Sequence, residues 1–318
     1  MDEQQSSMEI NNFNNKNLLV VGGTGFIGQH IVKESLHKGL NVWVLSKNSS
    51  VKSKFNSVNY LHVDIRSKEL LQFALKDKVF DYIINLGGYV DHANYSYGGE
   101  QVFNTHFDGL RNLINCVDRS NLKSFIQIGS SDEYGNNEAP QIENQREDPI
   151  SSYSCAKVAA TYFLQMLHKT ENFPVVILRP FLIYGPQQND KRFIPQVIKG
   201  CLEKKEFPTS KGLQIRDFCF IDDFVRAIFC ALNNKKVHGE ILNIASGKQV
   251  EVRKIINLII DLIGAGTPKF GKVAYRVGEN MELFSDISKS KKLLNWEPKV
   301  ALEEGLSITI DYYRDKAV

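Results

Sequence analysis

The stretch 18–32 constrains the fold more than any other part of the chain. Its first four residues, 18–21, are apolar and predict a buried strand, and a glycine cluster follows at once. Gly23, Gly25 and Gly28 fit the pattern G-x-G-x-x-G, whose glycines allow a tight turn, close backbone approach to a pyrophosphate and close packing of helix on strand. The stretch therefore predicts a strand, a phosphate-binding loop and a helix whose N-terminal N–H groups face an anion.

Strand and helix patterns keep alternating after this loop. Such alternation is typical of right-handed crossovers and of a parallel sheet with both faces covered by helices. A chain of 318 residues, 42% hydrophobic and 24% charged, also has room for a second lobe. We therefore expect an α/β protein, a Rossmann-type doubly wound parallel sheet with a smaller C-terminal α/β lobe. The predicted strands are 18–21, 42–45, 61–65, 81–86, 124–128 and 175–178, and the predicted helices are 28–39, 101–119 and 151–168.

Composition argues against several classes of function. The formal net charge of +3 gives no general attraction to nucleic acid or to an anionic membrane surface. The five cysteines include no C-x-x-C pair, so we expect reduced thiols and neither a disulfide framework nor a metal site. Residues 1–15 lack the basic and apolar regions of an export signal and are expected to form a disordered leader. No apolar run approaches the roughly 18 residues that cross a bilayer, so a cytoplasmic protein is expected.

The end of the second predicted strand bears on the choice of cofactor. An acid about 20 residues beyond the glycines would hydrogen-bond the ribose 2′-hydroxyl of NAD, but the chain has Ser46 and Lys47 there. A carboxylate would repel a 2′-phosphate, whereas a hydroxyl and an ammonium can accept it. This favours NADP(H), with NAD(H) as the alternative. In the plainer interpretation, Lys47 is an ordinary solvated lysine.

A candidate proton-transfer group follows the fifth predicted strand. The loop 129–135 falls at the carboxyl edge of the sheet, where ligands bind in open parallel sheets. Tyr153 and Lys157 are four residues apart and share one face of a predicted helix. Tyrosine is a poor base at neutral pH, but a neighbouring ammonium favours the phenolate. With a serine of the loop, these residues predict a proton donor and acceptor beside the nicotinamide.

These motifs resemble the extended short-chain dehydrogenase/reductase family, which comprises nucleotide-sugar epimerases, dehydratases and reductases. The resemblance covers about residues 17–314 and is more specific for fold than for substrate. The matching motifs are Gly22-Gly23-Thr24-Gly25-Phe26-Ile27-Gly28, Tyr153-x-x-x-Lys157, Leu178-Arg179-Pro180, Tyr184-Gly185-Pro186, Arg216-Asp217-Phe218, Asn243-Ile244-Ala245-Ser246-Gly247 and Leu294-Asn295-Trp296-Glu297-Pro298.

The resemblance implies a role for each part of the chain. A dinucleotide-binding domain would comprise 16–180 with 214–247, and a sugar-nucleotide-binding lobe 181–213 with 248–318. Helices near 101–119 and 151–168 would pair with their copies in a homodimer. Residues implied at the cofactor are Gly22, Gly25, Phe26, Ile27, Gly28, Asp64, Ile65, Leu86, Gly87, Tyr153 and Lys157. Residues implied at the nucleotide-sugar substrate are Phe193, Arg216 and Arg276, and those implied in catalysis are Tyr153, Lys157, Ser130 or Ser131, and Asp132.

Two departures from the family pattern affect the expected reaction. His106 stands where many members carry an asparagine, and Ser46 and Lys47 stand where NAD-retaining members carry an acid. The chain looks most like reductases of 4-keto-6-deoxy sugar nucleotides. The expected function is NADPH-dependent reduction of the C4 ketone, with Tyr153 as proton donor. The alternatives are an NAD-retaining 4,6-dehydratase, a 4-epimerase, and a dinucleotide sensor, which has no need of Tyr153 and Lys157.

The residues of the loop 130–135 bear on whether the enzyme is a reductase or a dehydratase. A 4,6-dehydratase needs a base and an acid in addition to the tyrosine. Asp132 and Glu133 could supply them only if this loop is one residue shorter than a dehydratase loop. In the ungapped register Ser131 and Asp132 take those positions, and a reductase could use Asp132 and Glu133 to orient sugar hydroxyls. Counting back from Tyr134 favours Ser130 as the catalytic serine, whereas matching the hydroxyl-acid-acid string favours Ser131.

Overall fold

The computed structural model describes residues 13–47, 55–275 and 278–317, which form two compact units. The first unit contains the described residues up to Glu133, with Ser151–Leu178 and Ile228–Ile241. The second contains Tyr134–Ile150, Arg179–Ala227 and the described residues from Leu242 onward. The sequence analysis instead assigned residues 214–247 to the dinucleotide-binding domain, whereas the structure divides them between the two units. The partition from the sequence stays a prediction of how cofactor and substrate binding divide along the chain.

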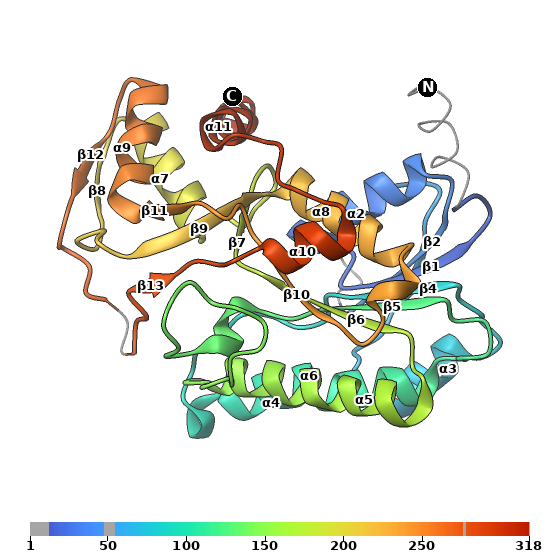
Figure 1. Ribbon diagram of the computed structural model, residues 1–318. Helices are drawn as coiled ribbons and strands as arrows, with labels where there is room; N and C mark the ends of the chain where they lie inside the picture. The colour runs from blue at the N-terminus through green and yellow to red at the C-terminus, as the bar shows by residue number, and fades with distance from the viewer. Residues whose placement is uncertain (1–12, 48–54, 276–277, 318) are drawn as a thin grey trace. The chain divides into compact units, whose positions relative to one another are not determined.

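A seven-stranded sheet runs through the fold in the order β10-β6-β5-β4-β1-β2-β3 (Figure 1). The pairs from β6 to β3 are all parallel. The order 3-2-1-4-5-6 within it is that of the dinucleotide-binding Rossmann sheet, so the predicted fold class is confirmed. The strands are β1 (Asn17–Val21), β2 (Asn41–Ser46), β3 (Asn59–His62), β4 (Tyr82–Asn85), β5 (Ser124–Ile128), β6 (Val175–Pro180) and β10 (Ile241–Ile244).

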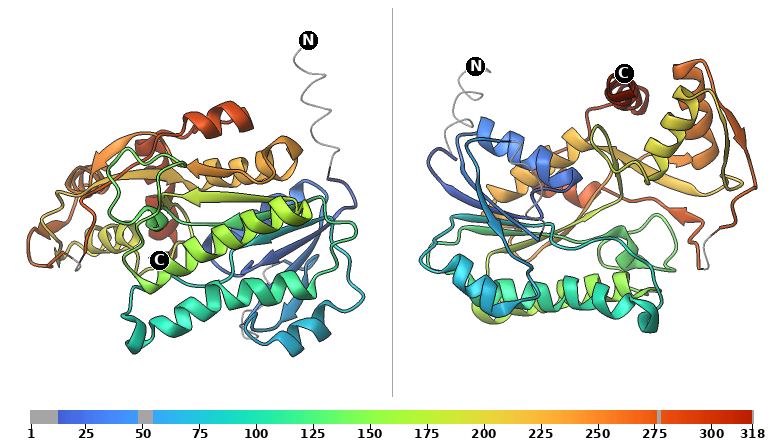
Figure 2. Two further views of the ribbon diagram at one scale, coloured as in Figure 1. Left: turned by 60° about the horizontal axis from the view of Figure 1, so that its bottom comes forward. Right: turned by 180° about the vertical axis from the view of Figure 1, so that it is seen from behind.

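Helices cover both faces of this sheet. Figure 2 shows α4 and α5 running one after the other beside α6, on the face opposite to α2. The predicted helix 101–119 is in fact two helices that meet at Phe107, whose backbone stays in the right-handed helical region. The chain therefore bends there without forming a loop. The helices of the first unit are α2 (Phe26–His37), α3 (Lys68–Leu75), α4 (Gly99–His106), α5 (Asp108–Cys116) and α6 (Ser152–Glu171).

Both ends of α6 have local causes. At its start the Ser151 hydroxyl accepts the N–H of Ser154, and the Ser154 hydroxyl accepts the N–H of Ser151, which is a capping box. At its end Asn172 adopts a left-handed conformation, with φ of 54°. The bounds of α6 are therefore set by hydrogen bonds and backbone conformation at its ends.

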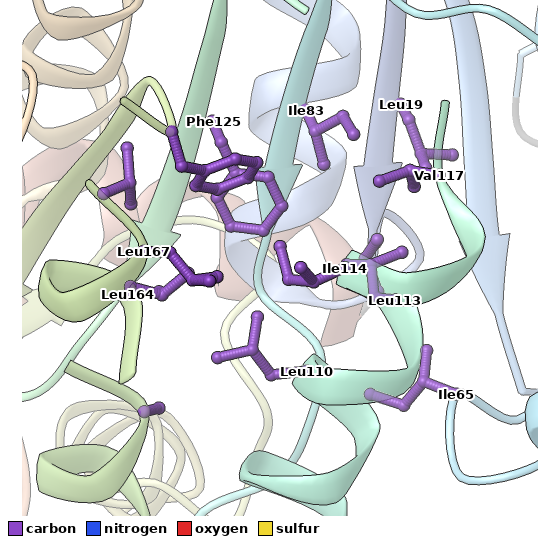
Figure 3. Packing of buried hydrophobic residues seen from close by; sticks show 14 of the residues in the cluster. Leu19, Ile65, Ile83, Leu110, Leu113, Ile114, Val117, Phe125, Leu164 and Leu167 are labelled. Atoms are coloured by element: carbon purple, nitrogen blue, oxygen red, sulfur yellow. The ribbon is translucent and has the colours of Figure 1, made fainter. Parts of the chain in front are cut away.

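The core of the first unit holds α5 and α6 against β1, β4 and β5 (Figure 3). Burying each large apolar side chain contributes about 1.5–3 kcal/mol. This packing fixes the first turns of α6 relative to the carboxyl ends of the strands. Strand residues in the core include Leu19, Ile83 and Phe125, and helix residues include Leu110, Leu113, Ile114, Leu164 and Leu167.

The second unit has a smaller sheet of its own. Its strands β11 (Gln249–Glu251) and β13 (Glu282–Leu283) flank β9 (Ile215–Phe220), which also pairs with β7 (Leu182–Tyr184). A two-stranded parallel sheet joins β8 (Glu206–Pro208) to β12 (Thr267–Lys269). The helices are α7 (Phe193–Leu202), α9 (Val252–Ile263), α10 (Ser288–Leu294) and α11 (Leu302–Ala317), while α8 (Ile221–Leu232) contributes to both units.

The predicted leader lies mostly outside the described residues, which begin at Phe13. Phe13 itself is buried and makes edge contacts with the rings of Tyr82 and Phe229. The N–H of Asn15 donates to Gly39 O at 3.1 Å, so these residues of the predicted leader are packed against the first unit. In the described ranges, none of the helices combines the length and the apolar character that crossing a membrane requires.

Candidate active site

The glycine loop joins β1 to α2 with its backbone exposed to a ligand. Gly22 adopts φ of +78°, and a Cβ at Gly28 would overlap the carbonyl oxygen of Gly22. A Cβ at Gly25 would meet only that oxygen, at 3.3 Å, so there is open space beside the Gly25 Cα. Phe26 and Ile27 open α2, and no side chain caps this helix in the described structure. The free N–H groups and the space in front of Gly25 fit the pyrophosphate of a dinucleotide.

Leu86 and Gly87, predicted at the cofactor, lie beside the glycine loop. The Leu86 N–H donates to Val21 O at 3.0 Å, and a Cβ at Gly22 would lie 3.1 Å from Leu86 O. The Gly87 N–H is held by the side chain of Asn85, also at 3.0 Å. Since β1 and β4 are neighbours in the sheet, the structure brings these predicted cofactor residues together at one carboxyl edge.

A charged cluster forms where β2 and β3 end. Ser46 is buried at the end of β2, and the next residue, Lys47, is two-thirds exposed with its Nζ 3.5 Å from Asp64 Oδ2. Arg66 Nη2 donates to the same oxygen at 2.6 Å, and this hydrogen bond is the main cause that lowers the pKa of Asp64 to about 2. Asp64 therefore stays ionised. Ile65 is buried under this edge. The strand β3 ends at His62, earlier than the predicted 61–65.

Tyr153 and Lys157 lie on the first turns of α6, as their spacing predicted. Both are buried, and Lys157 Nζ lies 5.8 Å from the centre of the Tyr153 ring. The ammonium donates to Ile128 O, the last residue of β5, at 2.8 Å. Burial lowers the pKa of Lys157 to about 8, although the carboxylates of Glu133 and Asp132 partly offset this. At neutral pH the ammonium is the majority form.

His106 packs against the other side of Tyr153. Its ring centre lies 5.0 Å from that of the tyrosine, at 79° between the planes. Its Nε2 lies 2.8 Å from Tyr89 O, a carbonyl that only accepts, so this nitrogen carries the proton. Burial, reinforced by the charge of Lys157, lowers the pKa of His106 to about 3. The histidine that replaces the family asparagine is therefore neutral and adds no charge beside the tyrosine.

The loop after β5 divides its two acids between different roles. Glu133 is fully buried, where it accepts the N–H of Ser130 at 2.9 Å and the hydroxyl of Thr161 on α6 at 2.8 Å. Asp132 keeps a partly exposed carboxylate, and its N–H donates to Ser130 Oγ at 3.1 Å. Glu133 thus holds the loop on α6, out of reach of a substrate. Ser130 and Ser131 are both nearly buried, and the choice of catalytic serine stays a prediction.

Replacing Glu133 by glutamine should move the alkaline loss of activity to lower pH. The Glu133 carboxylate raises the pKa of Lys157, so without it the buried ammonium loses its proton below the present value of about 8. Glutamine keeps an oxygen for the Ser130 N–H, so the loop should hold. The pH profile of kcat/KM is the measurement, because it reports groups of the free enzyme. An alkaline limb at the wild-type pH would contradict the role given to Lys157.

The predicted substrate residues lie on β9 and its neighbours in the second unit. The Phe193 ring, at the start of α7, lies 6.2 Å from the ring of Phe218. Arg216 is buried, ion-paired with Glu279, and donates to Asn280 O at 2.8 Å. The guanidinium that was predicted to bind a diphosphate is thus ion-paired with the Glu279 carboxylate, and its role in substrate binding stays a prediction. Arg276 lies outside the described residues.

Three residues that the sequence did not single out lie beside predicted ones. They are Arg66 next to Asp64, Glu279 next to Arg216, and His92 next to Asp132. The first could have been inferred, since an acid and a base two residues apart often pair where a strand ends. The others had no local signal, because Glu279 is 63 residues from its partner and His92 is 59 residues from Ser151, which it also contacts.

The chain has a Rossmann sheet, and the helix that follows its glycine loop has no side-chain cap. A tyrosine and a lysine lie on one helix at the carboxyl edge of this sheet. Together these features define a nicotinamide-dependent enzyme of short-chain dehydrogenase type. The chain belongs to the NAD dependent epimerase/dehydratase family, whose family model matches residues 18–245. Members of this family are NAD-dependent enzymes that act on nucleotide sugars. Action on nucleotide sugars agrees with the sequence analysis, whereas the preference for NADP(H) stays a prediction.

The relatives include 4-epimerases and a 4,6-dehydratase. The crystal structure of a UDP-glucose 4-epimerase with UDP-glucose, from Thermotoga maritima, is 27% identical with a TM-score of 0.87, over 95% of this chain and all of that one. A variant of UDP-glucuronic acid 4-epimerase from Bacillus cereus, in complex with NAD, is 28% identical with a TM-score of 0.84, over 94% and 99%. A dTDP-glucose 4,6-dehydratase of Xanthomonas campestris is 27% identical over 93% of this chain and 92% of its own.

Proposed function

We propose that the protein is an NAD-dependent 4-epimerase of a nucleotide-linked sugar, in which Tyr153 removes and returns the proton on O4. The placement of Tyr153 beside the Lys157 ammonium carries this proposal. Relatives that share 27% and 28% identity over nearly the whole chain are named as 4-epimerases, which supports it. The 4-keto reductase favoured by the sequence has no such specific support among them and becomes the second candidate.

Proton transfer at O4 is the task of the first turns of α6. Bound NAD would supply a hydride acceptor and later return the hydride to C4. Tyr153, as the phenolate, accepts the proton of the 4-hydroxyl, and the positive charge of Lys157 stabilises that phenolate. Lys157 is held in place by Ile128 O, so its charge does not move between the two half-reactions. Neutral His106 packs the ring without competing for the proton.

Burial of Glu133 argues against the dehydratase alternative. Elimination of water needs an acid at the departing hydroxyl and a base at C5. Asp132 is partly exposed, but Glu133 has its two oxygens engaged by Ser130 and Thr161 beneath the loop. This arrangement agrees with the ungapped register, in which Ser131 stands at the acid position and Asp132 at the base position of a dehydratase.

Incubation with nucleotide sugars, without added cofactor, tests the proposal. UDP-glucose, UDP-glucuronate and dTDP-glucose are suitable probes, and the products are read by nuclear magnetic resonance and mass spectrometry. The expected result is a C4 epimer of unchanged mass from at least one of them, with NAD released when the protein is denatured. Loss of one water to give a 4-keto product would instead identify a dehydratase. Conversion of a 4-keto sugar only with added NADPH would identify the reductase.

The cluster at the ends of β2 and β3 favours the reductase as second candidate. Ser46 stands where an acid would bind the ribose of NAD, and the Lys47 and Arg66 cations flank Asp64. Two cations against one carboxylate leave a positive charge at the edge where a 2′-phosphate would bind.

Replacing Lys47 by alanine should therefore narrow any preference for NADPH over NADH. A charge-assisted contact contributes about 1.5–3 kcal/mol, which is about one to two powers of ten in affinity. The measurement is the ratio of dissociation constants for the two cofactors, with Lys33→Ala, an exposed lysine on α2, as the control. Wild-type protein that carries stoichiometric NAD and ignores NADPH would contradict this second candidate.

The homodimer also stays a prediction. Its expected surface is formed by the helices near 101–119 and 151–168, which are α4, α5 and α6 in the structure. Tyr162 and Met166 lie one turn apart on α6 and are about half exposed, which gives that helix apolar surface for a partner copy.

A further inference from the structure

His92 lies at the junction of three segments of the first unit. It belongs to the loop after β4, at the carboxyl edge of the sheet. Its Nδ1 lies 3.4 Å from the hydroxyl of Ser151, the cap of α6, and its Nε2 lies 3.5 Å from Asp132 Oδ2. Its ring centre is 5.7 Å from that of Tyr153, at 77° between the planes. His92 and Asp132 are thus a side-chain pair next to the proposed proton donor.

This pair differs from the other polar groups around Tyr153 in its exposure. Lys157, His106 and Glu133 are buried, whereas the side chains of His92 and Asp132 are 35% and 30% exposed. A ligand that reaches Tyr153 from solvent would therefore meet these two side chains among the described polar groups around the ring.

The hydrogen-bond network accommodates a proton on His92 Nε2, although the Ser151 hydroxyl also lies 3.0 Å from Ser154 Oγ. Ser154 donates its hydroxyl proton to Ser151 O and its N–H to Ser151 Oγ. The Ser151 hydroxyl can then donate to His92 Nδ1, which leaves Nε2 as the donor that faces Asp132. At 3.5 Å, this donor and the carboxylate oxygen are farther apart than in a normal hydrogen bond. The His92 donor and the Asp132 acceptor thus lie side by side, and a ligand that binds both would break little direct bonding between them.

A sugar hydroxyl matches such a pair, because it accepts one hydrogen bond and donates another. We propose that His92 and Asp132 bind a single hydroxyl that flanks O4, on C3 or on C6, and that this contact makes the hydroxyl a requirement for turnover. The proposal rests on the proposed C4 chemistry, since it is the position of Tyr153 that puts the pair beside O4. In this proposal Asp132 accepts a hydrogen bond from the sugar hydroxyl, and His92 donates one to it.

A substrate-analogue cycle tests the pair. UDP-glucose and dTDP-glucose are compared with their 3-deoxy and 6-deoxy analogues, using wild type, His92→Gln and Asp132→Asn. In wild type, one of the two analogues should lose about 10- to 100-fold in kcat/KM, the usual contribution of hydrogen bonds in which one partner, here the Asp132 carboxylate, is charged. Each variant should lose a similar factor on the parent sugar and nothing further on that analogue. His37→Gln, a largely exposed histidine on α2, is the control and should match wild type.

Several results would overturn the proposal. A structural role for His92 would lower turnover of the parent and of both analogues by one common factor, and variants that match wild type on the parent would show no contact. Thermal melts establish that each variant folds. If wild type converts neither of these two sugar nucleotides nor UDP-glucuronate, the proposed function fails separately. Calorimetric binding of the same compounds then decides whether the variants still lose discrimination for one analogue. In that case, variants that bind the parent sugars and both analogues more weakly by the same factor would refute the proposed contact of His92 and Asp132 with a hydroxyl.

Discussion

Tyr153→Phe should lower turnover by about 10²- to 10⁴-fold, the usual contribution of a positioned acid or base, while leaving cofactor binding nearly intact. The phenylalanine keeps the ring that packs between His92 and His106, and only the hydroxyl is removed. Lys157 keeps its bond to Ile128 O, so the charge beside the cofactor also remains. The measurements are kcat on the sugar nucleotide that turns over, and the NAD content of the purified variant.

Tyr162→Phe is the matched control for this experiment. Tyr162 lies on the same helix but is 52% exposed, and its variant should retain wild-type turnover. Turnover of the Tyr153 variant within a few-fold of wild type would contradict its role as the proton donor. Loss of bound NAD from that variant would show instead that the hydroxyl positions the cofactor.

Gly28→Ala should lower the free energy of unfolding by about 3 kcal/mol, because overpacking of a rigid site costs this much. The added Cβ would overlap Gly22 O and lie 2.6 Å from Gly23 Cα. Both neighbours are backbone atoms of the turn, so α2 must move away from β1 to make room. Denaturant unfolding of the purified protein measures the effect.

Gly25→Ala is the matched variant, and it should weaken NAD binding without lowering the stability of the fold. Its Cβ would have Gly22 O at 3.3 Å as nearest neighbour, and the backbone angles of Gly25, φ −75° and ψ 176°, suit alanine. Stability should therefore stay near wild type. The methyl group would stand before the N–H groups of α2, so NAD binding should fall at least about tenfold, as each lost hydrogen bond to a charged group is worth about 1.5–3 kcal/mol. Full NAD content in this variant would place the pyrophosphate elsewhere.

Features set by short-range spacing could be predicted from the sequence. The glycine loop follows β1 directly, and Tyr153 and Lys157 are one helical turn apart, so each pattern indicates its geometry without knowledge of the rest of the chain. The alternation of strands and helices likewise predicted a doubly wound parallel sheet, and the structure confirms this fold class. The ends of single elements were less certain. Phe107 divides a helix whose apolar pattern continues across the bend.

Features set by tertiary contacts could not be predicted in this way. Asp132 and Glu133 are adjacent acids, and the sequence does not show which of them is buried. Only the packing of α6, which brings Thr161 to Glu133, turns one of them inward. The motif of Arg216 did not indicate that its guanidinium pairs with Glu279, which approaches from a distant segment, and its contact with a diphosphate stays a prediction. Such choices depend on which segments meet, and a local pattern does not contain that information.

Because Lys157 is buried, a rise in pH has opposite effects on catalysis and on the contribution of this residue to conformational stability. An unfolded lysine holds its proton to about pH 10.4, whereas the folded protein begins to release it near pH 8. Between these values the unfolded state binds more protons, so this residue makes the fold more stable with increasing pH. The ammonium that Tyr153 requires is lost over the same interval. Loss of activity through deprotonation of Lys157 would thus not by itself unfold the protein, and should reverse on return to neutral pH.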